Sequence, residues 1–173
     1  MSLAGTRKAN SNEIWSSKNC VEQQIVTDYI SSTFMQHGFI PNVSERFTKQ
    51  AGPVEHLCCI ISANNTESES KLWEMITNLS PTPALAGYPK QFAIDKIKQI
   101  EQHDRHYYGG YIGPIINNTE FSFFVNLRSL QITPSYYTIF AGGGITPDSV
   151  ALDEWEVTEI KPSTLLNLIK IAK

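Results

Sequence analysis

Three kinds of residue that could bind a small anion follow one another in the last third of the chain. Arg128 stands inside the apolar run FFVNLRSLQI, residues 142–144 are glycines after the aromatic run YYTIF, and Lys161 ends an acidic segment. A guanidinium in an apolar strand needs an anionic partner, and a glycine turn offers backbone N–H donors where a side chain would collide. An ammonium adds a second cation. This order of residues favours a small dicarboxylate as the ligand.

Each of these features also has a structural alternative. Arg128 can form a structural ion pair or lie at a sheet edge, and the glycines can make only a tight turn. Asp148 or Ser149 can cap the helix that follows. The acidic residues of that helix are Asp153, Glu154, Glu156 and Glu159. Four carboxylates on one helix are more often a solvated face than a metal site.

Histidines offer two further candidates. His56 lies in the apolar stretch VEHLCC, where a histidine is usually a satisfied strand residue. His103 and His106 are one helical turn apart and could share a zinc ion, but the sequence places no third ligand nearby.

Composition excludes several classes of partner. The chain has 173 residues, of which 41% are hydrophobic, enough for one domain with a sizeable core. Its formal net charge is -3, and no basic run occurs, so neither nucleic acid nor an anionic membrane is expected to bind. No apolar stretch reaches the roughly 20 residues of a membrane span, and no signal peptide is evident, which favours the cytoplasm. Cys20, Cys58 and Cys59 lack zinc or redox spacing and should stay reduced.

Several elements must position these residues. We expect a long helix over about 11–37, with Val21, Ile25 and Tyr29 on its apolar face, and two strands around a turn at 51–53. Helices follow at 68–80 and 90–105, separated by the Pro/Gly loop 81–89. The remainder alternates strands and turns and closes with a helix that contains Pro162. The fold class is therefore a layered α+β domain with a largely antiparallel sheet packed with helices.

The N-terminus has no element before its Gly-Thr-Arg turn. Residues 1–3, MSL, are expected to be a cloning scar, which leaves 4–173 as the domain.

Several motifs together resemble one enzyme family. RHYYGGYIGPI, NLRS, IFAGGGI, DEWEVTEIK and PTPALAGYP occur in the order of the C-terminal half of the chorismate-binding enzymes. That family includes isochorismate, salicylate, anthranilate and aminodeoxychorismate synthases. The loop LSPTPALAGYP is similar to the isochorismate synthase version, which serves menaquinone or siderophore biosynthesis.

The resemblance implies a ligand and a role for six residues. The ligand would be chorismate, a cyclohexadiene dicarboxylate, with Mg²⁺ on its ring carboxylate. Arg128 and Lys161 would hold substrate carboxylates, and Gly142 would supply a backbone donor. Gly5, in AGTR, would face the ligand. In the same family pattern, Glu22 of SSKNCVEQQIV would be a magnesium ligand, and His56 would lie near the migrating hydroxyl.

The chain departs from the family at the metal site. In the family pattern Glu-Trp-x-Glu-Thr-x-x-Lys, Val157 occupies the position of the second magnesium carboxylate. A valine cannot coordinate magnesium, so Glu154, Glu156 or water would have to fill the place. Gln23 replaces the histidine that usually follows Glu22. Ser80 replaces the histidine before Pro-Thr-Pro, and Pro162 directly follows Lys161.

The resemblance also places the catalytic acid and base outside this chain. Isochorismate formation adds water at one ring carbon and expels a hydroxyl from another, which needs a base and an acid on opposite faces. In the family these are a lysine and a glutamate upstream of the AGTR loop. We therefore expect a C-terminal part of an isochorismate synthase that lacks the N-terminal half of its domain and does not turn over alone.

Other functions stay open at this point. Another branch of the family would make salicylate or an aminated chorismate, although the PTPALAGYP loop argues against amination. Val157 and Gln23 also allow a non-catalytic descendant that acts as a binding module.

Overall fold

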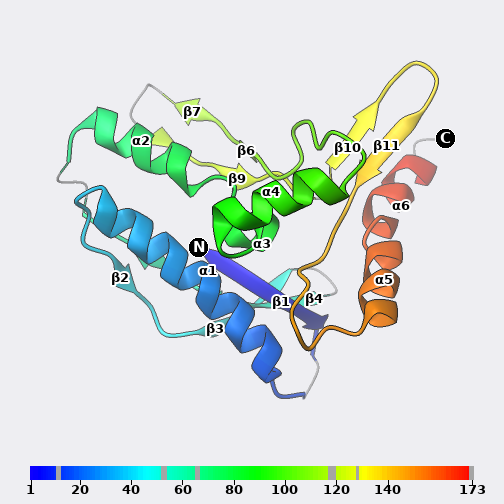
Figure 1. The fold of residues 1–173 in the computed structure, drawn as a ribbon, viewed down its shortest axis with the longest axis horizontal. Helices are drawn as coiled ribbons and strands as arrows, with labels where there is room; N and C mark the ends of the chain where they lie inside the picture. The colour runs from blue at the N-terminus through cyan, green and yellow to red at the C-terminus, as the bar shows by residue number, and fades with distance from the viewer. Residues whose placement is uncertain (11–12, 52–53, 65–66, 117–119, 128, 172–173) are drawn as a thin grey trace. The chain divides into compact units, whose positions relative to one another are not determined.

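The chain forms two compact units. The computed structural model describes residues 1–10, 13–51, 54–64, 67–116, 120–127 and 129–171 (Figure 1). The units are Met1–Ile97 and Lys98–Lys173, where the sequence analysis expected one domain. The boundary falls near the end of helix α4 (Lys90–Ile100). Each unit brings together its own share of the predicted site residues.

A three-stranded antiparallel sheet forms the base of the first unit. Its order is β1 (Ser2–Lys8), β4 (Val54–Cys59) and β3 (Phe47–Ala51). Leu57 of the central strand pairs with Ala4 on one side and Thr48 on the other. The expected hairpin is thus present. The expected N-terminal turn is wrong, because AGTR lies within β1, and Ser2 and Leu3 pair with Cys59 and Cys58.

A bulge interrupts β1 at the glycine of AGTR. The register shifts between Ala4 and Arg7, and Gly5 has a φ of 72°. A Cβ at Gly5 would lie 3.0 Å from Cβ of Asn19. Glycine is therefore needed both for the backbone conformation and for the close approach of α1.

Helix α1 (Ser17–Gln36) packs against this sheet. The Ser16 side chain accepts a hydrogen bond from the backbone N–H of Asn19, so the helix begins later than the expected 11. The expected apolar face is only partly correct, because Tyr29 packs against the core but Val21 does not. The buried positions are Gln23, Val26, Thr27, Ile30 and Thr33, and Val21 is 57% exposed.

A buried polar cluster explains this face. Gln23 is fully buried and donates from Nε2 to the hydroxyls of Ser2 (3.0 Å) and Thr27 (2.8 Å). Its Oε1 accepts from Nε of Arg46 at 2.9 Å. Because every polar atom of the amide has a partner, this position can be buried without an apolar side chain. Val26 and Ile30 form the adjoining hydrophobic core with Ile61.

Three helices complete the first unit. They are α2 (Glu69–Leu79), α3 (Pro83–Ala86) and α4. The single turn of α3 lies within the expected loop 81–89, because Pro83 occupies the first helical turn, where proline is tolerated. Lys90 binds this segment to its neighbours through Tyr29 Oη (2.8 Å) and the carbonyls of Asn78 (2.9 Å) and Ser80 (3.1 Å). A short ribbon pairs β2 (Asn42–Val43) with β5 (Ile61–Ser62).

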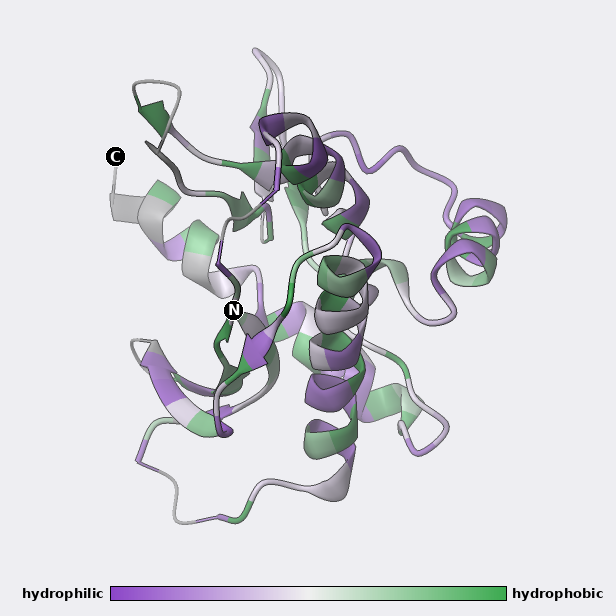
Figure 2. Ribbon diagram, turned by 90° about the vertical axis from the view of Figure 1, so that its left-hand side faces the viewer, coloured by the Kyte–Doolittle hydropathy of each residue, from purple (hydrophilic) through white to green (hydrophobic). Residues whose placement is uncertain are grey.

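The second unit is built from antiparallel ribbons and two helices. The paired strands are β6 (Tyr111–Ile112) with β9 (Phe124–Val125), β7 (Ile115–Ile116) with β8 (Glu120–Phe121), and β10 (Ser129–Ile132) with β11 (Tyr137–Phe140). Helices α5 (Ala151–Ile160) and α6 (Ser163–Ile171) follow. Figure 2 shows hydrophobic and hydrophilic residues alternating along the helices of the chain.

Pro162 separates the two closing helices. The backbone N–H groups of Leu165 and Leu166 donate to the Pro162 carbonyl, so the proline starts a new helix. The expected cap of α5 is wrong, because the N-cap is Val150, without a side-chain hydrogen bond. All described strand pairs are antiparallel, and the predicted α+β class with a largely antiparallel sheet is confirmed, divided among small sheets.

Candidate functional site

The first unit brings Gly5 and His56 together. Nδ1 of His56 lies 3.0 Å from the Gly5 carbonyl oxygen and 3.2 Å from Oγ1 of Thr6. A carbonyl oxygen can only accept, so Nδ1 carries the proton and donates. In the neutral ring, Nε2 is then the acceptor. The bulge in β1 thus sets the tautomer of His56.

Glu22 lies in the same unit, on α1. Its carboxylate is 4.0 Å from the Lys18 ammonium, one helical turn away. Asn19, one turn before Glu22, is the residue whose side chain meets Gly5. The helix therefore connects Glu22 to the glycine bulge, and the side chain of Glu22 is 24% exposed.

The second unit brings Gly142 and Lys161 together. Nζ of Lys161 donates to the Gly142 carbonyl oxygen over 2.6 Å. A Cβ added to Gly143 would lie 3.5 Å from Oε2 of Glu154 and 3.6 Å from Nζ of Lys161. One cation and one carboxylate of α5 therefore lie against the glycine turn.

Glu154 is held by the segment before α5. Oγ of Ser149 donates to Oε1 of Glu154 over 2.7 Å and accepts from the backbone N–H of Thr146 at 3.0 Å. Val157 is 39% exposed. The carboxylate of this helix that faces the glycine turn is thus Glu154, whereas position 157 offers no oxygen.

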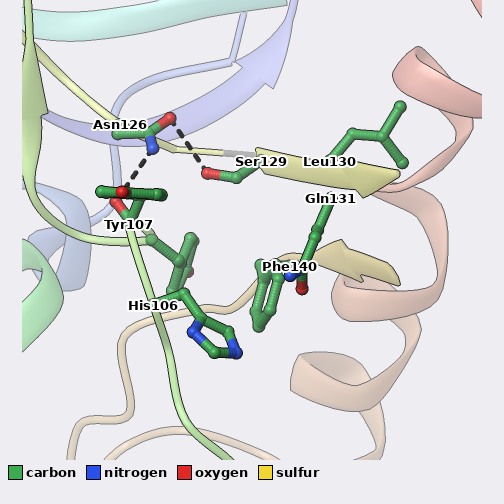
Figure 3. A pocket seen from close by; sticks show the side chains of 8 residues that line it. His106, Tyr107, Asn126, Ser129, Leu130, Gln131 and Phe140 are labelled. Carbon is green, nitrogen blue, oxygen red and sulfur yellow. Dashed lines mark hydrogen bonds between the residues drawn. The ribbon is translucent and has the colours of Figure 1, made fainter. Parts of the chain in front are cut away.

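A pocket of about 420 Å³ lies in the second unit (Figure 3). Its described lining residues are His106, Tyr107, Tyr108, Asn126, Ser129, Leu130, Gln131 and Phe140. The rings of Tyr108 and Phe140 stack with centroids 5.9 Å apart and planes 20° apart. A planar unsaturated ring suits such a wall.

Two hydrogen bonds fix one side of this pocket. Nδ2 of Asn126 donates to the Tyr107 carbonyl over 2.9 Å, and Oγ of Ser129 donates to Oδ1 of Asn126 over 3.0 Å (Figure 3). A Cβ at Gly142 would lie only 3.0 Å from the Tyr108 hydroxyl oxygen. Tyr108 therefore links the pocket to the glycine turn that Lys161 contacts.

The environment of Tyr108 favours its neutral form. Burial raises the pKa of the Tyr108 phenol, and the nearby Arg105 guanidinium opposes part of that effect. Arg105 itself binds Glu101 through Nε (2.8 Å) and Nη2 (2.5 Å). That hydrogen bonding lowers the pKa of Glu101. The phenol is thus a hydrogen-bond donor over the whole physiological range.

Of the side chains that line this pocket, sequence analysis singled out only His106, as a possible zinc ligand. Tyr108 and Phe140 belong to the motifs RHYYGGYIGPI and IFAGGGI, but an aromatic residue in a strand is ordinarily a core residue. Arg128 lies outside the described residues. In the described part of the chain, no group of three His, Cys, Asp or Glu side chains could hold a metal. His103 and His106 therefore have no third ligand among the described residues.

The chain matches a known family over most of its length. A model of the family described as "Chorismate binding enzyme" matches residues 4–170. Isochorismate synthase MenF of Bacillus subtilis is 35% identical over 88% of this chain, and isochorismate synthase EntC of Escherichia coli is 29% identical over 94%. This chain covers 32% and 41%, respectively, of those two proteins.

Solved structures give the same result. The menaquinone-specific isochorismate synthase MenF of Escherichia coli has a TM-score of 0.81 and 27% identity, covering 96% of this chain and 41% of its own. DhbC of Bacillus anthracis shares the fold with a TM-score of 0.80 at 22% identity, covering 97% of this chain and 48% of its own.

The fold of antiparallel ribbons and helices is thus shared with a solved isochorismate synthase. The chain belongs to the chorismate binding enzyme family. It spans about a third to two-fifths of the length of the curated relatives described above. Among its described helices, none has the length and apolar character needed to cross a membrane.

Proposed function

We propose that the chain is the C-terminal part of an isochorismate synthase, which converts chorismate to isochorismate, and that it does not turn over alone. The observation that carries the proposal is the 2.6 Å hydrogen bond between Lys161 and the Gly142 carbonyl, beside the pocket of Tyr108 and Phe140. Relatives named isochorismate synthases support the reaction class.

The second unit would bind the acid groups of the substrate. The Lys161 ammonium, which contacts the Gly142 carbonyl, would also bind a substrate carboxylate. The stacked rings of Tyr108 and Phe140 would support the unsaturated six-membered ring. The proposal also assigns a substrate carboxylate to Arg128, because a guanidinium can bind both carboxylate oxygens.

His56 would contact a substrate hydroxyl in the first unit. Its Nδ1 proton is engaged by Gly5, so Nε2 can accept a hydrogen bond from that hydroxyl. This contact orients the hydroxyl, and the proton transfers still require an acid and a base. The proposal places both in a segment of the longer relatives that this chain does not match, which is why the chain alone would be inactive.

Magnesium would neutralise substrate carboxylate charge, and the described residues fit it poorly. Within the first unit Glu22 is paired with Lys18, and position 157 in the second unit offers no oxygen ligand. We therefore assign Glu22 as the magnesium ligand of a weak site, completed by water and by the substrate.

Calorimetry on a version extended to the length of the relatives tests this proposal. Chorismate should bind more tightly with Mg²⁺ than without it, and Val157→Glu should enlarge that difference by adding a carboxylate. The control is Leu152→Glu, which adds the same charge at a 65% exposed position of α5. Chorismate that fails to bind with or without Mg²⁺ would show a non-catalytic descendant with a different ligand.

A further inference from the structure

His106 has an unusual backbone beside the pocket. Its φ is 47°, in the left-handed region that residues with a Cβ rarely adopt. The backbone N–H of His106 donates to Oδ1 of Asp104 over 2.8 Å, which holds this conformation. Such conformations persist where the surroundings impose them, and they are concentrated at ligand sites. This backbone conformation therefore fixes the direction of the imidazole side chain.

The imidazole forms part of the wall of the pocket. The imidazole meets the Phe140 ring edge-on, with centroids 6.3 Å apart and planes 81° apart (Figure 3). Nδ1 lies 3.8 Å from Oδ2 of Asp104, and the side chain is 51% exposed. The Asp104 carboxylate thus lies on the Nδ1 side of the ring.

The other described lining side chains cannot carry a positive charge. They present phenols, amides, a hydroxyl and apolar groups, and none of them is a carboxylate. Of this described set, only His106 can become cationic. A pocket with an aromatic wall and one such group suits an unsaturated or aromatic ring that bears a carboxylate.

We propose that His106 is a specificity-determining residue of this pocket: its imidazolium binds a carboxylate of a ring acid that lies against Tyr108 and Phe140. The identification of that acid as chorismate rests on the proposed function. The contact itself requires only a carboxylate on a ring of that size.

Several charged or titratable groups surround His106. Asp104 is its acidic neighbour, and Glu101 is bound to Arg105. His103 approaches the same Phe140 ring at 6.2 Å and is also 3.8 Å from Glu101. Burial raises the pKa of Tyr108, so that this phenol stays neutral. Because an imidazole is cationic only when it is protonated, the carboxylate should bind more tightly at lower pH.

Titration of the 173-residue chain with benzoate and with chorismate, at about pH 6 and about pH 8, tests the contact. The variant is His106→Asn, because asparagine tolerates the left-handed backbone and has no charge. The matched control is His103→Asn, since His103 approaches Phe140 but is not a lining residue. Wild type and control should bind about three- to fivefold more tightly at the lower pH, and His106→Asn should show no such change.

The two ligands separate this proposal from the proposed function. If benzoate binding depends on His106 and chorismate does not bind, the result would support the contact and count against the isochorismate synthase assignment. Chorismate that binds His106→Asn as tightly as wild type, with the same pH profile, would overturn the contact and leave that assignment standing. A folded chain that binds neither acid at either pH would overturn the proposal for this pocket.

Discussion

The ammonium of Lys161 and the carbonyl of Gly142 are joined by a 2.6 Å hydrogen bond. This bond fixes the end of α5 against the turn that follows β11. The carboxylate of Glu154, also on α5, lies next to Gly143 of the same turn. A cation held on the backbone in this way is already oriented when an anion arrives, so little side-chain entropy remains to be lost.

Replacement of Lys161 by methionine should lower chorismate turnover by the extended protein. Loss of a charged hydrogen bond to a substrate carboxylate corresponds to about a 10- to 100-fold fall in kcat/KM. Steady-state kinetics measures it. Lys98→Met, a change at an exposed lysine of α4, should leave kcat/KM unchanged. Equal kcat/KM values for the two variants would show that Lys161 does not bind the substrate.

An alanine at Gly142 should conflict with Tyr108. Its Cβ would lie 3.0 Å from the phenol oxygen, which forces the ring to shift and costs about 1 kcal/mol of unfolding free energy. Tyr108→Phe removes that oxygen and should recover most of the loss in the double variant. Urea denaturation of the wild type, the two single variants and the double variant gives the coupling energy. Gly143→Ala, whose new Cβ meets ordinary contacts, should show no coupling to Tyr108→Phe.

The buried amide of Gln23 should matter more for stability than its neighbour. Gln23→Ala removes three hydrogen bonds and leaves a cavity, so the unfolding free energy should fall by roughly 2–4 kcal/mol. Gln24→Ala, at an exposed position of the same helix, should change it by less than about 1 kcal/mol. Thermal and urea denaturation measure both. Similar losses would mean that the cluster around Ser2 contributes little.

Acid should weaken the first unit through Glu55. A hydrogen bond from the backbone of Asn10 lowers the pKa of Glu55, and the Arg7 side chain adds to the effect. The lowered pKa contributes stability that is fully present above the ordinary pKa of about 4.3. This stability is lost as pH falls through the lower pKa of the folded state. Melting temperatures from neutral pH downward should fall less steeply for Glu55→Gln. The exposed Glu74→Gln should follow wild type, and a slope unchanged by Glu55→Gln would contradict this assignment.

Much of the fold was predictable because its signals are local. The β3–β4 hairpin, α2 and the strand-rich second unit follow from turn residues and apolar periodicity. The buried face of α1 did not follow, because polar Gln23 and Thr27 are buried through hydrogen bonds to Ser2, a residue distant in sequence. Periodicity of apolar residues cannot detect a polar face of that kind.

The site was predictable only in part, for a related reason. The glycine turn and Lys161 were found from residue types, and the structure brings them together. Tyr108 and Phe140 were not, because their role depends on stacking across two segments that are separate in the sequence. His106 was noted only as a possible zinc ligand, and its left-handed backbone carries no signal in the sequence.

Product analysis by liquid chromatography is the most direct measurement. The folded 173-residue chain and the extended protein would each be incubated with chorismate and Mg²⁺. We predict isochorismate from the extended protein and no product from the chain alone. Salicylate or an aminated product would assign the protein to another branch of the family. Isochorismate from the chain alone, at a rate that falls in Lys161→Met, would contradict the division of the catalytic groups proposed here.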